Sequence, residues 1–299
     1  MTAYVLAHLS DPHLAPLPQP SARELMGKRV LGYLNWTRNR HAFHQHDVLD
    51  ALIADVTAQR PDHIAITGDL VNISLDAEFR QAAKWLRSVG PPEHVSLVPG
   101  NHDAYVPQMH DRFASEWADY LRGDKATPGS SVTFPYVQRR GPLALIGLST
   151  AVPTPPFMAT GQLGAAQLAA LEQTLAGISP DEAFRVILIH HPLDTDGKRR
   201  HKRLRDADEL TAILRRRGAE LVLHGHDHRH ATLWVDGISG KIPVVGVPSA
   251  SAADDGKHDP AAYNLFAITR ESDHWRCDMR VRSALKNGTW KNVRQTRLI

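Results

Sequence analysis

The sequence has little cysteine, no long apolar run and no strong excess of charge. Cys277 is the single cysteine among 299 residues, so neither an internal disulfide framework nor a cysteine-based metal site can form. Any bound metal must therefore be held by His, Asp, Glu or Asn. No run reaches the roughly 18 apolar residues of a membrane span, and no basic region precedes the first apolar run. We expect a soluble cytoplasmic protein, with contact to the inner face of the membrane left open.

The charge balance excludes little, but one residue type stands out. The formal net charge is +3 with an isoelectric point near 9.0, which is too weak to indicate nucleic-acid binding. The 42% hydrophobic content is sufficient for a sizeable core. Histidine, however, occurs 18 times. It is the commonest metal ligand among the side chains, so the positions of these histidines matter more than their number.

Short apolar runs alternate with amphipathic stretches along the chain. Five runs are nearly continuous in Val, Ile and Leu, as expected of strands buried on both faces: 4–10, 63–67, 94–99, 185–189 and 220–223. Five stretches carry apolar residues at helical spacing: 44–59, 77–89, 106–121, 165–175 and 207–217. Strands that alternate with helices indicate an α/β layer structure.

The pattern changes after Lys241, where strands follow one another without helices. These strands, with two earlier ones near 132–150, predict a second sheet packed on the first. The fold expected is a four-layer α/β/β/α sandwich of two mixed sheets flanked by helices. We expect a single domain over 1–299, strand-rich from about 241. An amphipathic segment at about 14–40 is inserted into it, either as a lid packed on the core or as a surface for lipid or substrate.

Each of the five apolar runs ends in a polar cluster. Ligands bind at the carboxyl ends of strands in such sheets, so the clusters should converge. They supply seven side chains of ligand type: Asp11, His13, Asp69, Asn101, His190, His226 and His228. This mixed set exceeds the three or four ligands of one zinc site and suits two metals that share a carboxylate. In each D-x-H or H-x-H pair, residues two apart on an extended chain would point to the same side.

The ordered motifs D-x-H, G-D, G-N-H-D, H and G-H-x-H resemble those of the calcineurin-like metallophosphoesterase superfamily. The resemblance covers roughly residues 4–268, and the chain is most similar to the bacterial branch of class III cyclic-nucleotide phosphodiesterases and glycerophosphodiesterases. It implies that the protein is a phosphoester hydrolase with two divalent ions (Mn, Fe, Zn or Co) and a hydroxide between them as the nucleophile.

The resemblance also implies a role for each motif residue. Asp11, His13 and His228 would hold the first ion, and Asn101, His190 and His226 the second, while Asp69 would bridge both. His102 would contact the phosphate and protonate the leaving alkoxide, with Asp103 orienting it. In the His-His pair the motif favours His190 as the ligand, with His191 as its supporting neighbour.

Substrate contacts are less well defined by the sequence. His191 and the basic run at 197–205, with Arg199, Arg200 and Arg203, are candidates, because this run follows His190 closely and should lie near the metal rim. A solvated loop is an equal alternative for the run. His44, at the start of a helix, is expected to be solvated.

Several substrates remain open. The first hypothesis is a small anionic phosphodiester, either a cyclic nucleotide or a glycerophosphodiester. The second is a lipid-linked pyrophosphate, since some members of the superfamily cleave UDP-diacylglucosamine with the help of an amphipathic insertion. A nuclease and a non-catalytic scaffold are weaker alternatives, because no added nucleic-acid-binding region is present and no ligand is missing. Exposed β-edges in the C-terminal half leave a homodimer open.

Overall fold

The computed structural model describes residues 2–109, 111–127, 129–193, 200–285 and 288–299. Its first sheet has the strand order β12-β11-β10-β1-β2-β3, with the first three strands of the chain parallel and the last three antiparallel. The strands of this sheet are β1 (Tyr4–Leu9), β2 (His63–Ile66), β3 (Val95–Leu97), β10 (Ala262–Glu271), β11 (His274–Ala284) and β12 (Trp290–Arg297).

The second sheet has the order β4-β5-β6-β7-β9-β8, in which the four central strands are parallel and both edge strands are antiparallel. Its strands are β4 (Tyr136–Arg140), β5 (Leu143–Gly147), β6 (Phe184–Leu188), β7 (Leu221–His224), β8 (Ala231–Gly237) and β9 (Gly240–Gly246). Both sheets are therefore mixed, as the sequence predicts.

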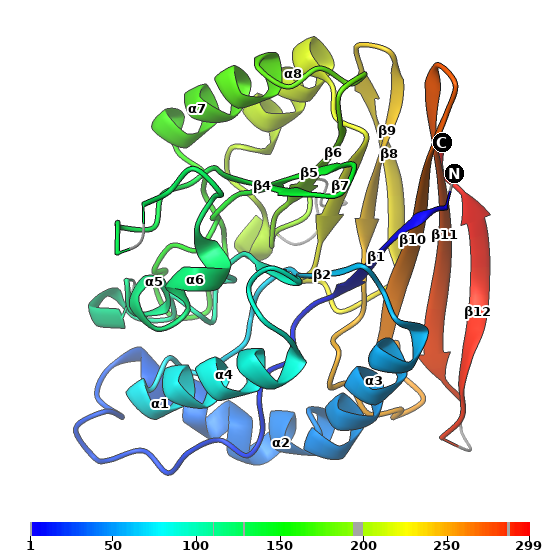
Figure 1. Ribbon diagram of the computed structural model, residues 1–299. Coiled ribbons are helices and arrows are strands. Elements are labelled where there is room, and N and C mark those ends of the chain that lie inside the picture. Colours follow the sequence, from blue (N-terminus) through cyan, green and yellow to red (C-terminus); the bar gives the residue numbers. More distant parts are fainter. Residues whose placement is uncertain (1, 110, 128, 194–199, 286–287) are drawn as a thin grey trace.

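Helices cover the outer faces of the two sheets (Figure 1). The first sheet is covered by α3 (His46–Gln59), α4 (Asp76–Val89), α5 (Arg112–Glu116) and α6 (Ala118–Leu121). The second is covered by α7 (Ala165–Ala176) and α8 (Ala207–Arg217). A third apolar core lies between the sheets. The four-layer α/β/β/α sandwich is thus confirmed.

Alternating side chains explain why both sheets are buried on both faces. In β5, Leu143 and Leu145 point into the core between the sheets, whereas Ala144 and Ile146 point towards α7 and α8. A strand with two apolar faces can only be stable with a layer on each side. The continuous apolar runs of the sequence are the direct cause of the four layers.

Three details differ from the sequence-based expectation. The strands after Lys241 do not form a sheet of their own, because β9 joins the second sheet and β10 to β12 join the first. The edge strand β8 was not predicted, since its alternating exposure leaves only one apolar face. The helix expected over 106–121 is broken into a 3₁₀ turn (Pro107–Met109) and the short helices α5 and α6.

The inserted segment at 14–40 is helical in its second half. It contains α1 (Lys28–Asn35) and a π-helical turn (Trp36–Arg40), and the short α2 (His41–Phe43) follows it directly. These elements lie beside α3 and α4 at the bottom of Figure 1. Among the described residues, no helix combines the length and apolar character needed to cross a membrane.

Candidate metal centre

The seven candidate ligands follow the carboxyl ends of five strands that belong to different sheets. Strands β1, β2 and β3 of the first sheet and β6 and β7 of the second each run into one ligand motif. The loops hold one another through backbone hydrogen bonds, with Asp11 N–H donating to the Gly68 carbonyl at 3.0 Å and Gly225 N–H donating to the His190 carbonyl at 3.1 Å. The site therefore forms where the edges of both sheets meet.

These loops approach more closely than side chains would permit. A Cβ built on Gly100 would lie 2.2 Å from Asp69 Oδ1, and one on Gly225 would lie 1.9 Å from Ser10 Oγ and 2.4 Å from Asp11 Oδ2. Such contacts are far shorter than van der Waals distance, so only glycine fits at either position.

Backbone strain is concentrated at the ligands. Five of the nine described non-glycine residues with positive φ are candidate ligands: Asp11 (52°), His13 (39°), Asp69 (57°), His226 (70°) and His228 (52°). This left-handed conformation costs an ordinary residue about 1 kcal/mol or more. The expectation that the D-x-H and H-x-H pairs lie on extended chain is wrong, because the chain curls at each ligand instead.

The donor atoms form groups that share one carboxylate. Asp11, His13 and Asp69 offer ligand atoms within 4.8 Å of one another, and so do Asp69, His190 and His226. Asn101 Oδ1 lies 3.2 Å from His190 Nε2, and His228 Nε2 lies 3.1 Å from Asp11 Oδ1. Because Asp69 belongs to both groups, it stands where a bridging carboxylate is needed.

Backbone carbonyls fix which nitrogen of each imidazole faces the centre. A carbonyl only accepts hydrogen bonds, so its partner nitrogen must carry the hydrogen. His13 Nδ1 donates to Val71 at 3.2 Å, His190 Nδ1 to Thr67 at 2.6 Å and His226 Nε2 to Lys202 at 3.0 Å. The other nitrogen keeps its lone pair in the neutral rings of His13 and His226, whereas His190 must lose a proton before it can bind a cation. Ligating histidines are commonly oriented in this way, so the donor set fits two divalent cations.

Electrostatics within the cluster also favour a cation. Burial disfavours the carboxylate of Asp69, but the neighbouring His190 and His102 outweigh it and hold the pKa of Asp69 well below its usual range. Burial likewise opposes the charged form of His190, yet Asp69 raises the pKa of His190 to about 10. The carboxylate is therefore ionised, and a proton on His190 balances part of its charge in the metal-free protein.

His102 lies at the edge of the cluster, but its orienting partner is not the expected one. Its Nδ1 lies 2.5 Å from the Asn72 carbonyl, whereas Asp103 accepts hydrogen bonds from backbone N–H groups at 2.8–3.1 Å: those of Asp69, Leu70, Val71 and Gly100. The predicted contact between Asp103 and His102 is wrong, because the buried carboxylate is fully used in joining the two loops. Burial, reinforced by the charge of Arg40, lowers the pKa of His102 to about 3.

The candidate substrate contacts divide into buried and exposed residues. His191 is buried, with Nε2 facing the Ala159 carbonyl at 3.1 Å and Nδ1 facing Thr150 Oγ1 at 2.7 Å. It is thus not placed to touch a substrate, contrary to expectation. Of the two neighbouring histidines, it is His190 whose Nε2 faces the cluster. Arg200 and Arg203 are exposed, and the adjoining Lys202 carbonyl reaches His226. Arg199 lies outside the described residues.

Two residues of this site were missed from the sequence. His44 is buried rather than solvated, and its ring nitrogen lies within 4.8 Å of ligand atoms of His13 and His228. Arg40 places its guanidinium among the imidazoles, 2.9 Å from His13 Nε2. Both belong to the inserted region and its continuation. No local motif marks them, so only the packing of this region onto the strand ends could reveal them.

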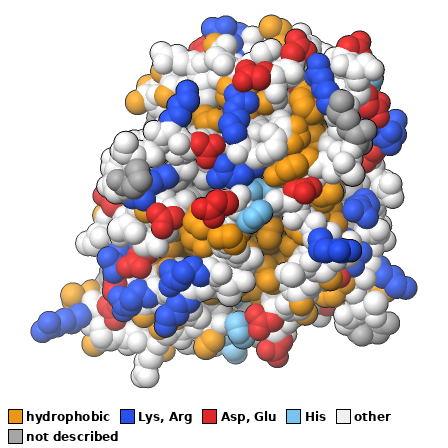
Figure 2. Space-filling model, in the orientation of Figure 1, with side chains coloured by type: hydrophobic (Ala, Val, Ile, Leu, Met, Phe, Trp, Pro, Cys, Tyr) orange, Lys and Arg blue, Asp and Glu red, His pale blue; other side chains and the backbone are white. Residues whose placement is uncertain are grey.

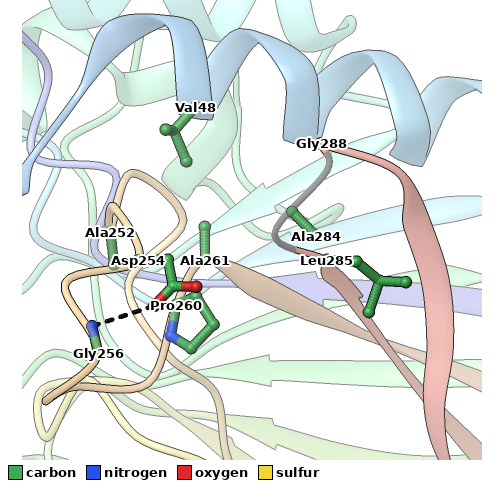
Figure 3. A pocket seen from close by; sticks show the side chains of 9 residues that line it. All are labelled: Val48, Ala252, Asp254, Gly256, Pro260, Ala261, Ala284, Leu285 and Gly288. Atoms are coloured by element: carbon green, nitrogen blue, oxygen red, sulfur yellow. Dashed lines mark hydrogen bonds between the residues drawn. The ribbon is translucent and has the colours of Figure 1, made fainter.

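A separate cavity of about 520 Å³ lies between α3, the loop that follows β9 and the chain at the end of β11 (Figure 3). It is bordered by Val48 of α3, by Ala252 and Ala261 of that loop, and by Leu285 beyond β11. Of the nine labelled lining residues, Asp254 alone carries a charge, and it accepts a hydrogen bond from Gly256 N–H. Ligand sites combine apolar walls with several convergent polar groups, so this cavity is a poor candidate.

Comparisons with known proteins identify the fold and the family of this chain. Among proteins of curated function, none matches the sequence significantly. A dimetal phosphatase from Danio rerio superposes with a TM-score of 0.62 at 12% identity, covering 100% of this chain and 99% of that one. A purple acid phosphatase from yellow lupin gives 0.63 at 13% identity, covering 97% of this chain and 53% of that one. A 5'-nucleotidase precursor from Thermus thermophilus gives 0.50 at 15% identity, covering 93% and 54%.

At these identities the structural matches establish a shared fold. The sequence itself matches a family model over residues 4–230, which spans most of the chain and all seven candidate ligands. The chain belongs to the calcineurin-like phosphoesterase family.

Proposed function

We propose that the protein is a binuclear metal-dependent phosphodiesterase acting on a small anionic substrate, either a cyclic nucleotide or a glycerophosphodiester. The observation that supports this most is the position of Asp69, which is shared by two donor groups, one with residues that follow β1 and one with residues that follow β6 and β7. A single structural metal would need only one such group. Two ions side by side suit an in-line displacement at phosphorus.

The first ion would be held by Asp11, His13 and His228, the second by Asn101, His190 and His226, and both by Asp69. When bound, the two ions supply Lewis-acid polarisation of the phosphoryl oxygens and lower the pKa of coordinated water. Oxygen and imidazole donors accommodate Mn, Fe, Zn or Co, and cells select among these by availability as well as affinity.

The protein groups around the ions would position the substrate and move one proton. The Asn72 carbonyl fixes His102 with its Nε2 towards the site. A phosphoryl anion that enters beside His102 favours its protonated form, and the proton at Nε2 would then pass to the leaving alkoxide. Asp103 holds the loop that carries Asp69 against the loop that carries Asn101. The exposed Arg200 and Arg203 would draw the anionic substrate towards the rim.

One feature favours a lipid-linked pyrophosphate as the second candidate. Apolar side chains of α1, and of Met26 two residues before it, are unusually exposed: Met26 (73%), Val30 (40%), Leu31 (38%) and Leu34 (40%). Figure 2 shows apolar and basic side chains together at the lower left, the part of the view in which Figure 1 places α1 and α4. Such a surface suits a substrate with an acyl chain and a charged head, or contact with a membrane surface.

The test is hydrolysis of bis(p-nitrophenyl) phosphate beside p-nitrophenyl phosphate after reconstitution with Mn²⁺, for wild type and Asn101→Ala. We expect the diester to be hydrolysed only with metal and the variant to lose this activity. If two ions bind but neither compound is hydrolysed, the simple diesterase is excluded. UDP-diacylglucosamine, assayed with and without detergent, then tests the second candidate.

A further inference from the structure

The region from α1 to α2 is packed against the loops of the candidate metal centre. A Cβ on Gly32 would lie 2.6 Å from Ile73 and 2.8 Å from Tyr105 Oη, so α1 touches the loop that follows Asp69. The Arg29 guanidinium donates to the Ile73 and Ser74 carbonyls. These contacts fix the start of the π-helical turn, which ends at Arg40.

The Arg40 guanidinium lies at the centre of a group of three imidazoles. Its Nη2 is 2.9 Å from His13 Nε2 and 3.4 Å from His44 Nε2, and its Nη1 is 3.1 Å from His102 Nε2. The Nδ1 atoms of His13 and His102 face backbone carbonyls, and His44 Nδ1 faces Ser251 Oγ at 2.9 Å. The lone pair of His13 Nε2 therefore faces the guanidinium. Arg40 Nη1 also lies 3.4 Å from His102 Nδ1 and so rests against that ring, while the hydroxyl beside His44 can donate or accept.

This cation has no anionic partner of its own. Within the described parts of the chain, no carboxylate oxygen forms an ion pair with Arg40 within 4 Å. Arginine stays protonated inside proteins. Burial opposes the charge of Arg40, and the carboxylates of Asp69 and Asp11 compensate it only from beyond ion-pair distance. An anion of the right shape would improve its environment. A guanidinium matches a phosphate because two parallel N–H groups can reach two oxygens.

Arg40 and the first ion cannot use His13 at the same time. A metal held by an imidazole lies about 2.1 Å from the nitrogen, which is the space and the lone pair that Arg40 Nη2 now takes. Binding of the ion must therefore release the guanidinium. Its other end already touches His102, where the phosphoryl group of the substrate would lie.

We propose that Arg40 is a phosphoryl-binding residue supplied by the inserted region, and that it alternates with the first ion at His13. In the metal-free protein the guanidinium occupies the place of a cation. In the loaded protein it turns towards the substrate and binds two phosphoryl oxygens. This inference rests on the proposed function for its substrate, but the competition at His13 does not depend on turnover.

The experiment measures two equilibria by calorimetry on the full chain: Mn²⁺ binding to metal-free protein, and inorganic phosphate binding to Mn²⁺-loaded protein. The variants are Arg40→Gln and Arg40→Lys, with Arg38→Gln as the control on the same turn, where the side chain is exposed. For Arg40→Gln we expect the affinity for the first ion to rise about tenfold, because the ion no longer has to displace a guanidinium from His13. We expect the affinity for phosphate to fall about tenfold, because one charge-assisted hydrogen-bonded contact to the anion is lost. Arg40→Lys should bind phosphate with intermediate affinity, because it keeps the charge without the planar fork.

In Arg40→Gln the affinity for the first ion should rise while the affinity for phosphate falls, and these opposite changes distinguish this role from a structural one. A residue that merely supports the fold would weaken both equilibria when replaced. A fall in first-ion affinity in Arg40→Gln, or unchanged phosphate affinity, overturns the inference. If wild type binds Mn²⁺ and phosphate but hydrolyses no phosphoester, the proposed function fails while the assignment of Arg40 can still be judged.

Discussion

Six of the buried histidines of this protein form two sets that differ in their hydrogen-bond partners and in their backbone conformation. One set lies inside strands: His8 in β1, His63 in β2 and His224 in β7. The other follows strand ends and includes His13, His190 and His226. In the interior set each ring leaves one nitrogen without a partner among the described residues. In the strand-end set each ring gives one nitrogen to a backbone carbonyl and turns the other towards shared carboxylates.

Backbone conformation separates the sets further. The interior histidines sit in regular strands, while His13 and His226 have left-handed backbones. Strain of this kind persists only where the surrounding structure enforces it. A high histidine content is therefore no evidence for a metal site by itself. Convergent lone pairs on a strained backbone are evidence, and the following substitutions test whether this distinction decides function.

The largest effect is expected at the carboxylate shared by both donor groups. Asp69→Asn removes the negative charge common to both ions, so activity should fall by about 1000-fold or more, equivalent to about 4 kcal/mol of lost transition-state stabilisation. His63→Gln, in the interior set, is the control and should keep kcat and KM within about twofold. Steady-state kinetics on the bis(p-nitrophenyl) ester measures both. Comparable losses in the two variants would remove the distinction between the sets.

The next effect concerns the close approach of the loops. A Cβ at Gly225 meets Ser10 and Asp11, so Gly225→Ala should displace the Asp11 carboxylate and weaken first-ion binding by about 10- to 100-fold, the range seen when groups that orient ligands are changed. Gly177→Ala is the matched control, because its nearest neighbours lie at 3.5 Å or more. Calorimetric titration with Mn²⁺ measures the affinity. Equal affinities in the two variants would show that the loops can separate at no cost.

Asp103 should act on the metal only through the backbone. Asp103→Asn keeps the size of the side chain but replaces one acceptor oxygen by a donor, so some of the four N–H groups lose their partner. We expect metal affinity to fall about tenfold and the free energy of unfolding to fall by about 1–3 kcal/mol. Urea denaturation of metal-free protein gives the stability. If kcat falls with neither metal affinity nor stability changed, Asp103 acts directly on His102 after all.

The smallest effect is a pH dependence of stability that arises in the interior set. Burial, with the charge of Arg140 adding to it, lowers the pKa of His63 to about 3. Between the unfolded pKa of about 6.5 and this value the unfolded chain binds one proton more than the native one, so His63 makes stability fall as pH falls, by up to about 1.4 kcal/mol per pH unit. In His63→Gln the free energy of unfolding, measured by urea denaturation, should depend on pH less steeply between pH 6 and 4, by up to that amount. A curve that is equally steep in the variant would contradict the buried neutral state.

Much of the fold could be predicted because its signals are local. Continuous apolar runs identified the parallel strands, and helical spacing identified α3, α4, α7 and α8. The partition of the last strands could not be predicted, since an antiparallel strand such as β10 pairs equally well with either sheet until the packing is known. The broken helix at 106–121 shows the same limit, because its apolar stripe is interrupted by turns that only tertiary contacts stabilise.

The candidate site divides in the same way. The ligand motifs could be found because each is a short pattern at a strand end. The partners of His102 and Asp103 could not be predicted. Both side chains bind backbone groups, the Asn72 carbonyl and several N–H groups, and a backbone group is the same whichever residue carries it. Arg40 and His44 could not be predicted as site residues because they lie about 30 residues from Asp11, in the inserted region and just after it, where no motif marks them. Long-range packing brings them to the site.

The central claim is that two ions share Asp69. The most direct measurement is the number of Mn²⁺ ions bound per chain, by elemental analysis after dialysis against the metal, for wild type, His228→Ala and Asn101→Ala. Two ions in wild type and one in each variant is the expected result, because each variant removes a ligand of one ion only. A single ion in wild type, or loss of both ions in either variant alone, would contradict a binuclear centre with separate donor groups.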